Sequence, residues 1–210
     1  MVSRHLSSEW LKPVPDHTRR AADDALQWLA DHGDRPLILD SFCGTGMSTT
    51  VLANQHPDAL VLGVDKSADR LSRHGMAECD SPDSIRRAGE KLSNYRLIRA
   101  ECEPFWRCLL DAHIQLHSHY LLYPNPWPKG SQLKRRIHGH PAFPLLQQLG
   151  GNLELRTNWE IYAREFAAAV ELLSCAGHLE TFVPAEPMTL FERKYHERHQ
   201  VLWRYRGQFS

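Results

Sequence analysis

The sequence predicts an α/β fold built on a doubly wound, mostly parallel sheet. Three observations predict it: apolar runs of strand length alternate with helical segments, a glycine-containing turn follows the first run, and no long helix separates the last two runs. Strands that alternate with helices are typical of parallel β-α-β units. The last two runs indicate an antiparallel hairpin at the C-terminal edge of that sheet.

The elements of the first half follow from local patterns. Apolar residues recur at helical spacing from residue 16 to residue 32, and Gly33 is a helix-stop signal. A short apolar run, residues 37–40, predicts the first strand. The pattern then predicts a helix over 48–55, a strand over 59–65, a helix over 68–79 and a polar loop over 80–94.

The second half continues the alternation. We expect a strand over 95–101, a helix over 104–113, a strand over 119–123, a basic and turn-rich segment over 129–141, and a strand over 152–156. A long helix over 159–174 carries Phe166, Ala169, Val170 and Leu173 on one face. Two further strands, 178–183 and 200–205, form the predicted hairpin.

Length and charge limit what the chain can be. Its 210 residues favour one globular unit, and 42% hydrophobic with 24% charged residues excludes wholesale disorder. We expect residues 1–35 to form a helical segment packed on a domain spanning 36–210. The 25 basic and 25 acidic residues give a net charge of zero, which excludes attraction of nucleic acid by global charge. A local basic patch remains compatible with a net charge of zero.

The sequence shows no targeting signal and no metal-binding motif. Residues 1–10 lack a secretory signal, and no apolar run approaches the roughly 20 residues that span a bilayer. Five scattered cysteines without a Cys-x-x-Cys pair predict neither a disulfide framework nor a zinc site. His113, His117 and His119 lack regular ligand spacing, so we expect no metal. We expect a cytoplasmic protein that is a monomer or a homodimer.

A candidate nucleoside site follows the first three strands. Gly44 and Gly46 in the turn after Asp40 permit positive φ and close approach of the backbone to a ligand. Asp65 ends the next strand, where a carboxylate can accept from a ribose diol, and Glu101 ends the third. Acids at successive strand ends suit a cationic nucleoside, and S-adenosylmethionine fits. The alternative is an ordinary strand-to-helix turn with solvated acids.

A rigid turn and a basic segment follow the fourth strand. The turn reads Tyr-Pro-Asn-Pro-Trp-Pro over residues 123–128; its prolines fix φ, Trp127 offers a stacking face, and Asn125 offers a donor and an acceptor. The four cations that come next are Lys129, Lys134, Arg135 and Arg136. They are candidates for contact with an RNA backbone. The alternative is a rigid surface turn with a solvated basic face.

The chain resembles the bacterial tRNA (guanine-N7-)-methyltransferases. The resemblance rests on five motifs in family order over residues 37–206: Pro124-Asn125-Pro126-Trp127, Lys134-Arg135-Arg136, Gly150-Gly151, Thr157-Asn158-Trp159 and Thr189-Leu190-Phe191-Glu192. It implies a Rossmann-like class I methyltransferase fold, S-adenosylmethionine as cofactor and tRNA as partner.

The resemblance also implies residue roles. Asp40, Asp65 and Glu101 would contact the cofactor, as would Asn125, which is also the candidate catalytic residue. Lys129, Asn158, and Thr189 to Glu192 would contact the substrate. Taken alone, Thr189 and Glu192 are typical of a helix capping box.

Asn125 and Asn158 stand where the family has aspartates. Methyl transfer to guanine N7 removes no proton, so an asparagine can still position the base. It cannot accept two hydrogen bonds from a guanine edge as a carboxylate can. Three outcomes follow: a retuned guanine methyltransferase, a changed target, or a non-catalytic paralogue that binds cofactor or RNA. The Asn-Pro-Trp turn is also similar to the Asn-Pro-Pro-aromatic turn of amino-group methyltransferases, a weaker likeness because the second proline is missing.

Overall fold

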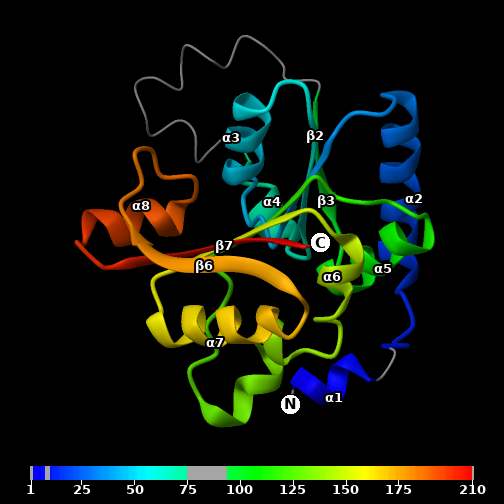
Figure 1. Cartoon of the computed structure of the whole chain (residues 1–210). Helices are drawn as coiled ribbons and strands as arrows, with labels where there is room; N and C mark the ends of the chain where they lie inside the picture. The colour runs from blue at the N-terminus through cyan, green and yellow to red at the C-terminus, as the bar shows by residue number, and fades with distance from the viewer. Residues whose placement is uncertain (1, 8–9, 75–93, 210) are drawn as a thin grey trace.

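The computed structural model describes residues 2–7, 10–74 and 94–209, and these form a seven-stranded sheet flanked by helices (Figure 1). The strand order is β3-β2-β1-β4-β5-β7-β6. The first five strands along this order are parallel, and β7 pairs antiparallel with both β5 and β6. The predicted doubly wound sheet with a C-terminal antiparallel edge is therefore confirmed.

The strands lie where the apolar runs predict them, with shifts of a few residues. They are β1 (Leu37–Ser41), β2 (Leu60–Asp65), β3 (Tyr95–Arg99), β4 (Ser118–Leu122), β5 (Asn152–Thr157), β6 (Cys175–Phe182) and β7 (Leu202–Phe209). The last two differ most from prediction, since β6 begins earlier and β7 ends later. Their ends are set by cross-strand pairing, which runs from Cys175 opposite Phe209 to Phe182 opposite Leu202.

The helices follow the same order. The longer ones are α2 (Asp16–Asp31), α3 (Met47–Gln55), α5 (Cys102–Asp111), α7 (Glu160–Glu171) and α8 (Leu190–Glu197). The short ones are α1 (Val2–Leu6), α4 (Ala68–Leu71), α6 (Leu145–Leu149), and the 3₁₀ turns η2 (Gly130–Arg135) and η3 (Ile137–Gly139). The helix expected over 68–79 ends at Leu71, and the loop expected over 80–94 lies, except for Asn94, outside the described residues.

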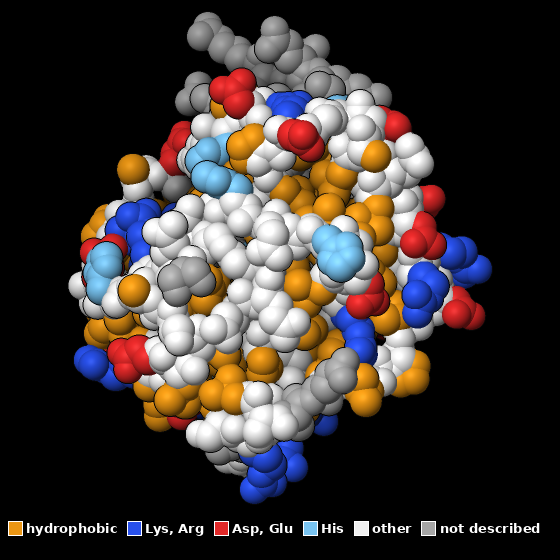
Figure 2. Space-filling model, turned by 45° about the vertical axis from the view of Figure 1, so that its right-hand side comes forward, with side chains coloured by type: hydrophobic (Ala, Val, Ile, Leu, Met, Phe, Trp, Pro, Cys, Tyr) orange, Lys and Arg blue, Asp and Glu red, His pale blue; other side chains and the backbone are white. Residues whose placement is uncertain are grey.

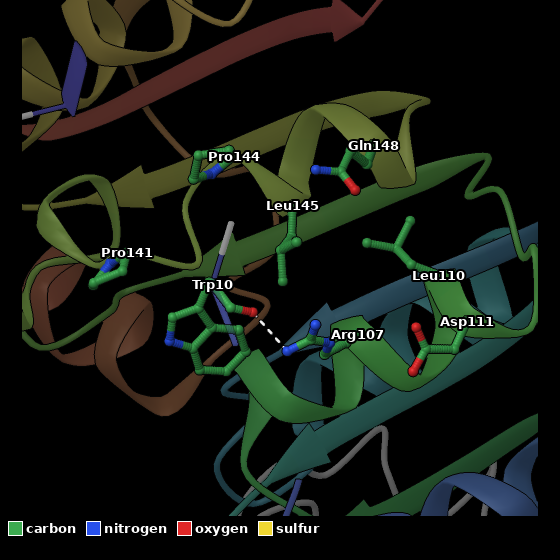
Figure 3. Close-up of a pocket in the computed structure, with 8 residues that line it drawn as sticks. All are labelled: Trp10, Arg107, Leu110, Asp111, Pro141, Pro144, Leu145 and Gln148. Atoms are coloured by element: carbon green, nitrogen blue, oxygen red, sulfur yellow. Dashed lines mark hydrogen bonds between the residues drawn. The ribbon is translucent and has the colours of Figure 1, made fainter. Parts of the chain in front are cut away.

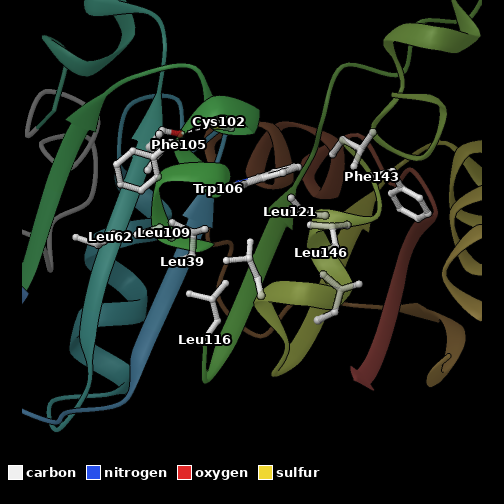
Figure 4. Packing of buried hydrophobic residues seen from close by; sticks show 14 of the residues in the cluster. Leu39, Leu62, Cys102, Phe105, Trp106, Leu109, Leu116, Leu121, Phe143 and Leu146 are labelled. Atoms are coloured by element: carbon white, nitrogen blue, oxygen red, sulfur yellow. Dashed lines mark hydrogen bonds between the residues drawn. The ribbon is translucent and has the colours of Figure 1, made fainter. Parts of the chain in front are cut away.

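Two hydrophobic cores cover the two faces of the sheet, because successive strand residues point to opposite faces. On β1, Leu37 and Leu39 pack with α2, α5, α6 and α7, whereas Ile38 packs with α3. Figure 4 shows Phe105, Trp106 and Leu109 of α5 extending toward the strands. In Figure 1, α2 and α3 lie on opposite sides of β2, and α7 and α8 on opposite sides of β6.

Within the described residues, no helix combines the length and the apolar character needed to cross a membrane.

Candidate active site

The strand order creates one reversal point, between β1 and β4. The chain leaves β1 toward β2 and β3, then returns to place β4 on the other side of β1. In open α/β sheets, ligands bind outside the carboxyl ends of the strands at such a point. The glycine turn follows β1 and the Pro-Asn-Pro-Trp turn follows β4, so the two segments singled out by sequence flank the reversal point.

The backbone of the turn after β1 has a conformation that favours glycine at two positions. Gly44 and Gly46 have φ of 63° and 80°, in the left-handed region. A Cβ at Gly46 would lie 2.7 Å from the Leu97 side chain, whereas no atom lies within 4 Å of the position of a Cβ at Gly44. Gly44 is therefore the place where the backbone is open to a ligand.

Asp40 lies beneath this turn as a fully buried carboxyl group. Its Oδ2 accepts hydrogen bonds from the hydroxyls of Ser48 (2.6 Å) and Thr49 (2.7 Å), while Oδ1 is buried without a hydrogen-bond partner. Burial raises the pKa of Asp40 to about 6, against the lowering effect of the two hydroxyls. The chain thus leaves one acceptor unused at the end of β1.

Asp65 is also buried, and it holds the turn from the end of β2. Its carboxylate accepts from the amides of Gly44 (3.0 Å) and Ser67 (2.8 Å) and pairs with the Arg70 guanidinium at 3.1 Å. Two of its acceptor sites therefore shape the glycine turn and the start of α4.

Glu101, after β3, is the most exposed of the three acids, with 36% of its side chain accessible. It accepts from the Thr18 hydroxyl at 2.6 Å and from His17 Nε2 at 2.8 Å, and both partners come from α2. Partial burial opposes ionisation, but the Thr18 hydrogen bond and the adjacent His17 bring the pKa of Glu101 below its ordinary value. No local sequence signal marks Thr18 or His17, because their partner lies more than 80 residues away.

The Pro-Asn-Pro-Trp turn holds an unusual backbone. Tyr123 and Trp127 have φ of 52° and 43°, which is uncommon for residues with a Cβ and persists where the surroundings hold it. Between them Asn125 is exposed, and its Oδ1 accepts from the Trp127 amide at 3.3 Å. That bond uses one of the two acceptor sites of Oδ1, and the exposed side chain also offers the two donors of its amide nitrogen.

The basic segment divides into exposed and buried parts. Lys129, Lys134 and Arg135 are exposed, and the Arg135 guanidinium lies 4.9 Å from the Trp127 ring centroid. Arg136 is buried: it pairs with Glu165 of α7 and donates to the Trp127 carbonyl oxygen. The prediction that Arg136 grips a phosphate is therefore corrected, because its guanidinium ties the turn to α7.

Glu192 needs a second correction. The resemblance predicts contact with the target nucleotide, but Glu192 has no exposed surface. Its carboxylate accepts from Arg156 (3.1 and 3.2 Å), from the Tyr123 hydroxyl (3.0 Å) and from the Met188 amide (2.7 Å). Glu192 is therefore an internal anchor of α8.

Thr189 and Asn158 are placed nearer the surface. The Thr189 hydroxyl accepts from the Glu192 amide at 3.0 Å, which makes it the N-cap of α8, as the capping interpretation predicts. Asn158 is half-buried, and its amide nitrogen donates to Gln200 Oε1 at 2.9 Å.

The sequence motifs do not predict the network around Arg156. Arg156 lies between Glu154 (2.6 Å) and Glu192 (3.1 Å), and Arg206 of β7 pairs with Glu154 at 2.9 Å. Burial disfavours the charged guanidinium, but the two carboxylates raise the pKa of Arg156 above its ordinary value. The alternation of Glu154 and Arg156 on β5 is the one local signal for it.

A separate small pocket lies between α5, α6 and the N-terminal segment (Figure 3). Its volume is about 120 Å³, and the Arg107 guanidinium donates to the Trp10 carbonyl oxygen at its rim. Pockets that bury a drug-sized ligand hold about 300–1,000 Å³. None of its lining residues belongs to the predicted site, so this pocket is not the candidate active site.

On the face that Figure 2 shows, basic and acidic side chains lie mostly around the edge, and the centre carries few of either. The exposed cations next to the Pro-Asn-Pro-Trp turn therefore matter as a local feature and not through the total charge of the chain.

Residues 34–205 match the family model described as "Putative methyltransferase". The tRNA (guanine-N(7)-)-methyltransferase of Leifsonia xyli is 32% identical over 169 residues, covering 76% of this chain and 70% of that enzyme. The enzyme of the same name from Acinetobacter baylyi is 29% identical over 174 residues, or 78% of this chain. The chain spans 66% of the length of that relative.

Solved structures share the fold at low sequence identity. One described as an antibiotic-related methyltransferase has a TM-score of 0.62 at 16% identity, covering 89% of this chain and 94% of that one. The 16S rRNA methyltransferase KamB has a TM-score of 0.59 at 16% identity, covering 96% and 97%.

Proposed function

Since the chain belongs to the methyltransferase family whose model matches residues 34–205, we propose that it transfers a methyl group from S-adenosylmethionine to guanine N7 in tRNA. The observation that carries the proposal is the placement of the glycine turn and the Pro-Asn-Pro-Trp turn on the two sides of the β1–β4 reversal point. The names of the relatives support the nucleotide and the RNA class.

The residues present fit the cofactor. Gly44 is open, Asp40 Oδ1 lacks a partner, and Glu101 presents a partly exposed carboxylate at the neighbouring strand end. S-adenosylmethionine, when bound, supplies an electrophilic methyl group. Asp40 would provide an unused acceptor, Asp65 would hold the turn through its bond to the Gly44 amide, and Glu101 would accept from the nucleoside. Gly46 is the N-cap of α3 and adopts the left-handed conformation there.

Asn125 would orient the target base. Guanine N7 carries a lone pair, so the chain needs to align the base and needs no general base. The exposed side-chain amide nitrogen of Asn125 can donate to O6, the acceptor next to N7 on guanine. An aspartate at this position would offer an acceptor there. We infer that Asn125 retunes substrate contact and does not abolish it.

The remaining exposed groups would hold the RNA. Lys129, Lys134 and Arg135, which are exposed, would neutralise phosphates beside the turn, and the half-buried Asn158 and Thr189 would contact the substrate. We also propose that residues 1–35 act as one unit with the domain over 36–210, because α2 supplies both partners of Glu101. The cytoplasm is the compartment we propose, since Cys43, Cys102, Cys108 and Cys175 are free thiols.

Nucleoside mass spectrometry tests the proposal. Bulk tRNA that lacks N7-methylguanine is incubated with the chain and S-adenosylmethionine, and we expect N7-methylguanine to appear. Asn125→Ala should lower kcat about tenfold or more, whereas Asn54→Ala, on the exposed side of α3, should not change it. A methylated amino group in place of N7-methylguanine would refute the proposal in favour of an amino-group methyltransferase. Binding of S-adenosylmethionine without any transfer would favour a non-catalytic paralogue.

A further inference from the structure

Helix α8 is held on the sheet by the buried carboxylate of Glu192, which faces inward with no exposed surface. Its bonds to Arg156 on β5 and to the Tyr123 hydroxyl tie the helix to two neighbouring strand ends. A buried carboxylate is tolerated because it is paired and hydrogen-bonded. The residues on the outer side of α8 are therefore displayed from a fixed position.

Three aromatic side chains form a row that runs from the Pro-Asn-Pro-Trp turn to the solvent. The Tyr123 and Tyr195 ring centroids are 5.9 Å apart, and the Tyr195 and Phe191 rings lie nearly parallel, 6.2 Å apart at 21°. Tyr123 directly precedes Pro124 and Asn125, and Phe191, at the outer end, is 50% exposed. We name Tyr123, Tyr195 and Phe191 the aromatic row.

The charges around the row favour an anionic partner. Lys194 Nζ lies 5.7 Å from the Tyr195 ring centroid, and Arg193 and Arg198 belong to the same helix and its end. Glu192 is buried in its own ion pairs, so Glu197 is the one acid of α8 left to offset these cations. Exposed aromatic rings beside cations are typical of surfaces that bind single-stranded nucleic acid.

We propose that the aromatic row is a stacking platform for an unpaired nucleobase of the RNA, next to the target guanine. The inference rests on the proposed function and adds a second point of contact to it. A base extruded for chemistry leaves its neighbours without a stacking partner. Phe191 offers such a neighbour an exposed ring face, while Lys194 and Arg193 are placed for the adjoining phosphates.

The test compares substitutions at Phe191 in the full-length chain. Phe191→Leu keeps an apolar side chain and removes the ring face, whereas Phe191→Tyr keeps the face. With tRNA lacking N7-methylguanine as the probe, Phe191→Leu should raise Kd and KM about 5- to 150-fold, the range for one lost base–aromatic stack. Phe191→Tyr should stay within about twofold of the wild type, the Kd for S-adenosylmethionine should not change, and kcat should change less than KM.

Leu172→Ala, which trims another exposed apolar side chain at the end of α7, is the matched control and should leave tRNA binding unchanged. If the wild type methylates tRNA and Phe191→Leu binds tRNA with the same affinity, the stacking platform is refuted. The proposed function would not be affected by that result. A change in sedimentation with Phe191→Leu would instead identify the row as a contact between proteins. A wild type that neither binds nor methylates tRNA would overturn both proposals.

Discussion

Asp40 is the residue where stability and binding are in conflict. Its pKa is raised from 3.8 to about 6 in the folded chain, chiefly by burial, so ionisation is less favourable folded than unfolded. The cost is absent below about pH 4 and complete above about pH 6. A shift of about two pKa units corresponds to roughly 3 kcal/mol of unfolding free energy.

Asp40→Asn should therefore flatten the dependence of stability on pH. We expect the unfolding free energy of the wild type to fall relative to that of the variant as the pH rises from 4 to 7, by about 3 kcal/mol. Urea denaturation at a series of pH values measures it. Parallel curves for the two proteins would mean that the Asp40 carboxyl titrates normally in the folded chain.

Glu101 depends on a helix remote in sequence. Thr18→Val removes the hydroxyl that donates to the Glu101 carboxylate at 2.6 Å and keeps the size of the side chain. We expect the Kd for S-adenosylmethionine to rise about tenfold, which corresponds to the lower end of the free energy that a hydrogen bond to a charged group contributes. Thr18→Ser, which retains the hydroxyl, should bind nearly as tightly. Calorimetry measures both, and a Kd for Thr18→Val equal to that of the wild type would show that Thr18 does not affect cofactor binding.

At the residue scale, local chemistry was predictable and partners were not. The residue type alone predicts the left-handed conformation of Gly44 and Gly46. Arg136 and Glu192 look like substrate residues in the sequence, yet each is buried against a distant partner: Glu165, 29 residues away, and Arg156, 36 residues away. Charge in a motif does not say whether the group faces the ligand or the interior.

At the scale of elements, the Arg156 network joins β5, β7 and α8, and it includes Tyr123, the residue after β4. Arg156→Met leaves Glu192 buried without its cation, and such a loss costs about 3–5 kcal/mol of unfolding free energy. Arg164→Met, which removes an exposed pair with Glu160, should cost less than about 1 kcal/mol. Urea denaturation of both variants provides the comparison. Equal losses would show that α8 does not depend on the buried pair.

The strands and long helices were predictable because their apolar runs and helical spacing are local. The sequence pattern does not predict helix α6, because its five residues lie in a segment with Pro141 and Pro144 that favours turns. The pattern also does not predict the full extent of β7, because residues 206–209 show no apolar alternation and pair with β5 and β6.

For the whole molecule, zero net charge describes a sum over opposed regions. Because Arg136 is buried, the cations of the 129–136 segment that face solvent are Lys129, Lys134 and Arg135. Replacing both Lys134 and Arg135 with alanine should weaken tRNA binding. It should also make the slope of log K against log salt less steep by about 1.4–1.8, the value for two phosphate contacts. An unchanged slope in binding titrations from low to moderate salt would exclude these two residues from the RNA contact.

The central claim is transfer to one atom, guanine N7, and it can be tested at that atom. A tRNA transcript made with guanosine and one made with 7-deazaguanosine, which has carbon in place of N7, are incubated with the chain and methyl-labelled S-adenosylmethionine. We predict label in the guanosine transcript and none in the 7-deazaguanosine transcript. Equal labelling of the two transcripts, or none in the first, would contradict the claim.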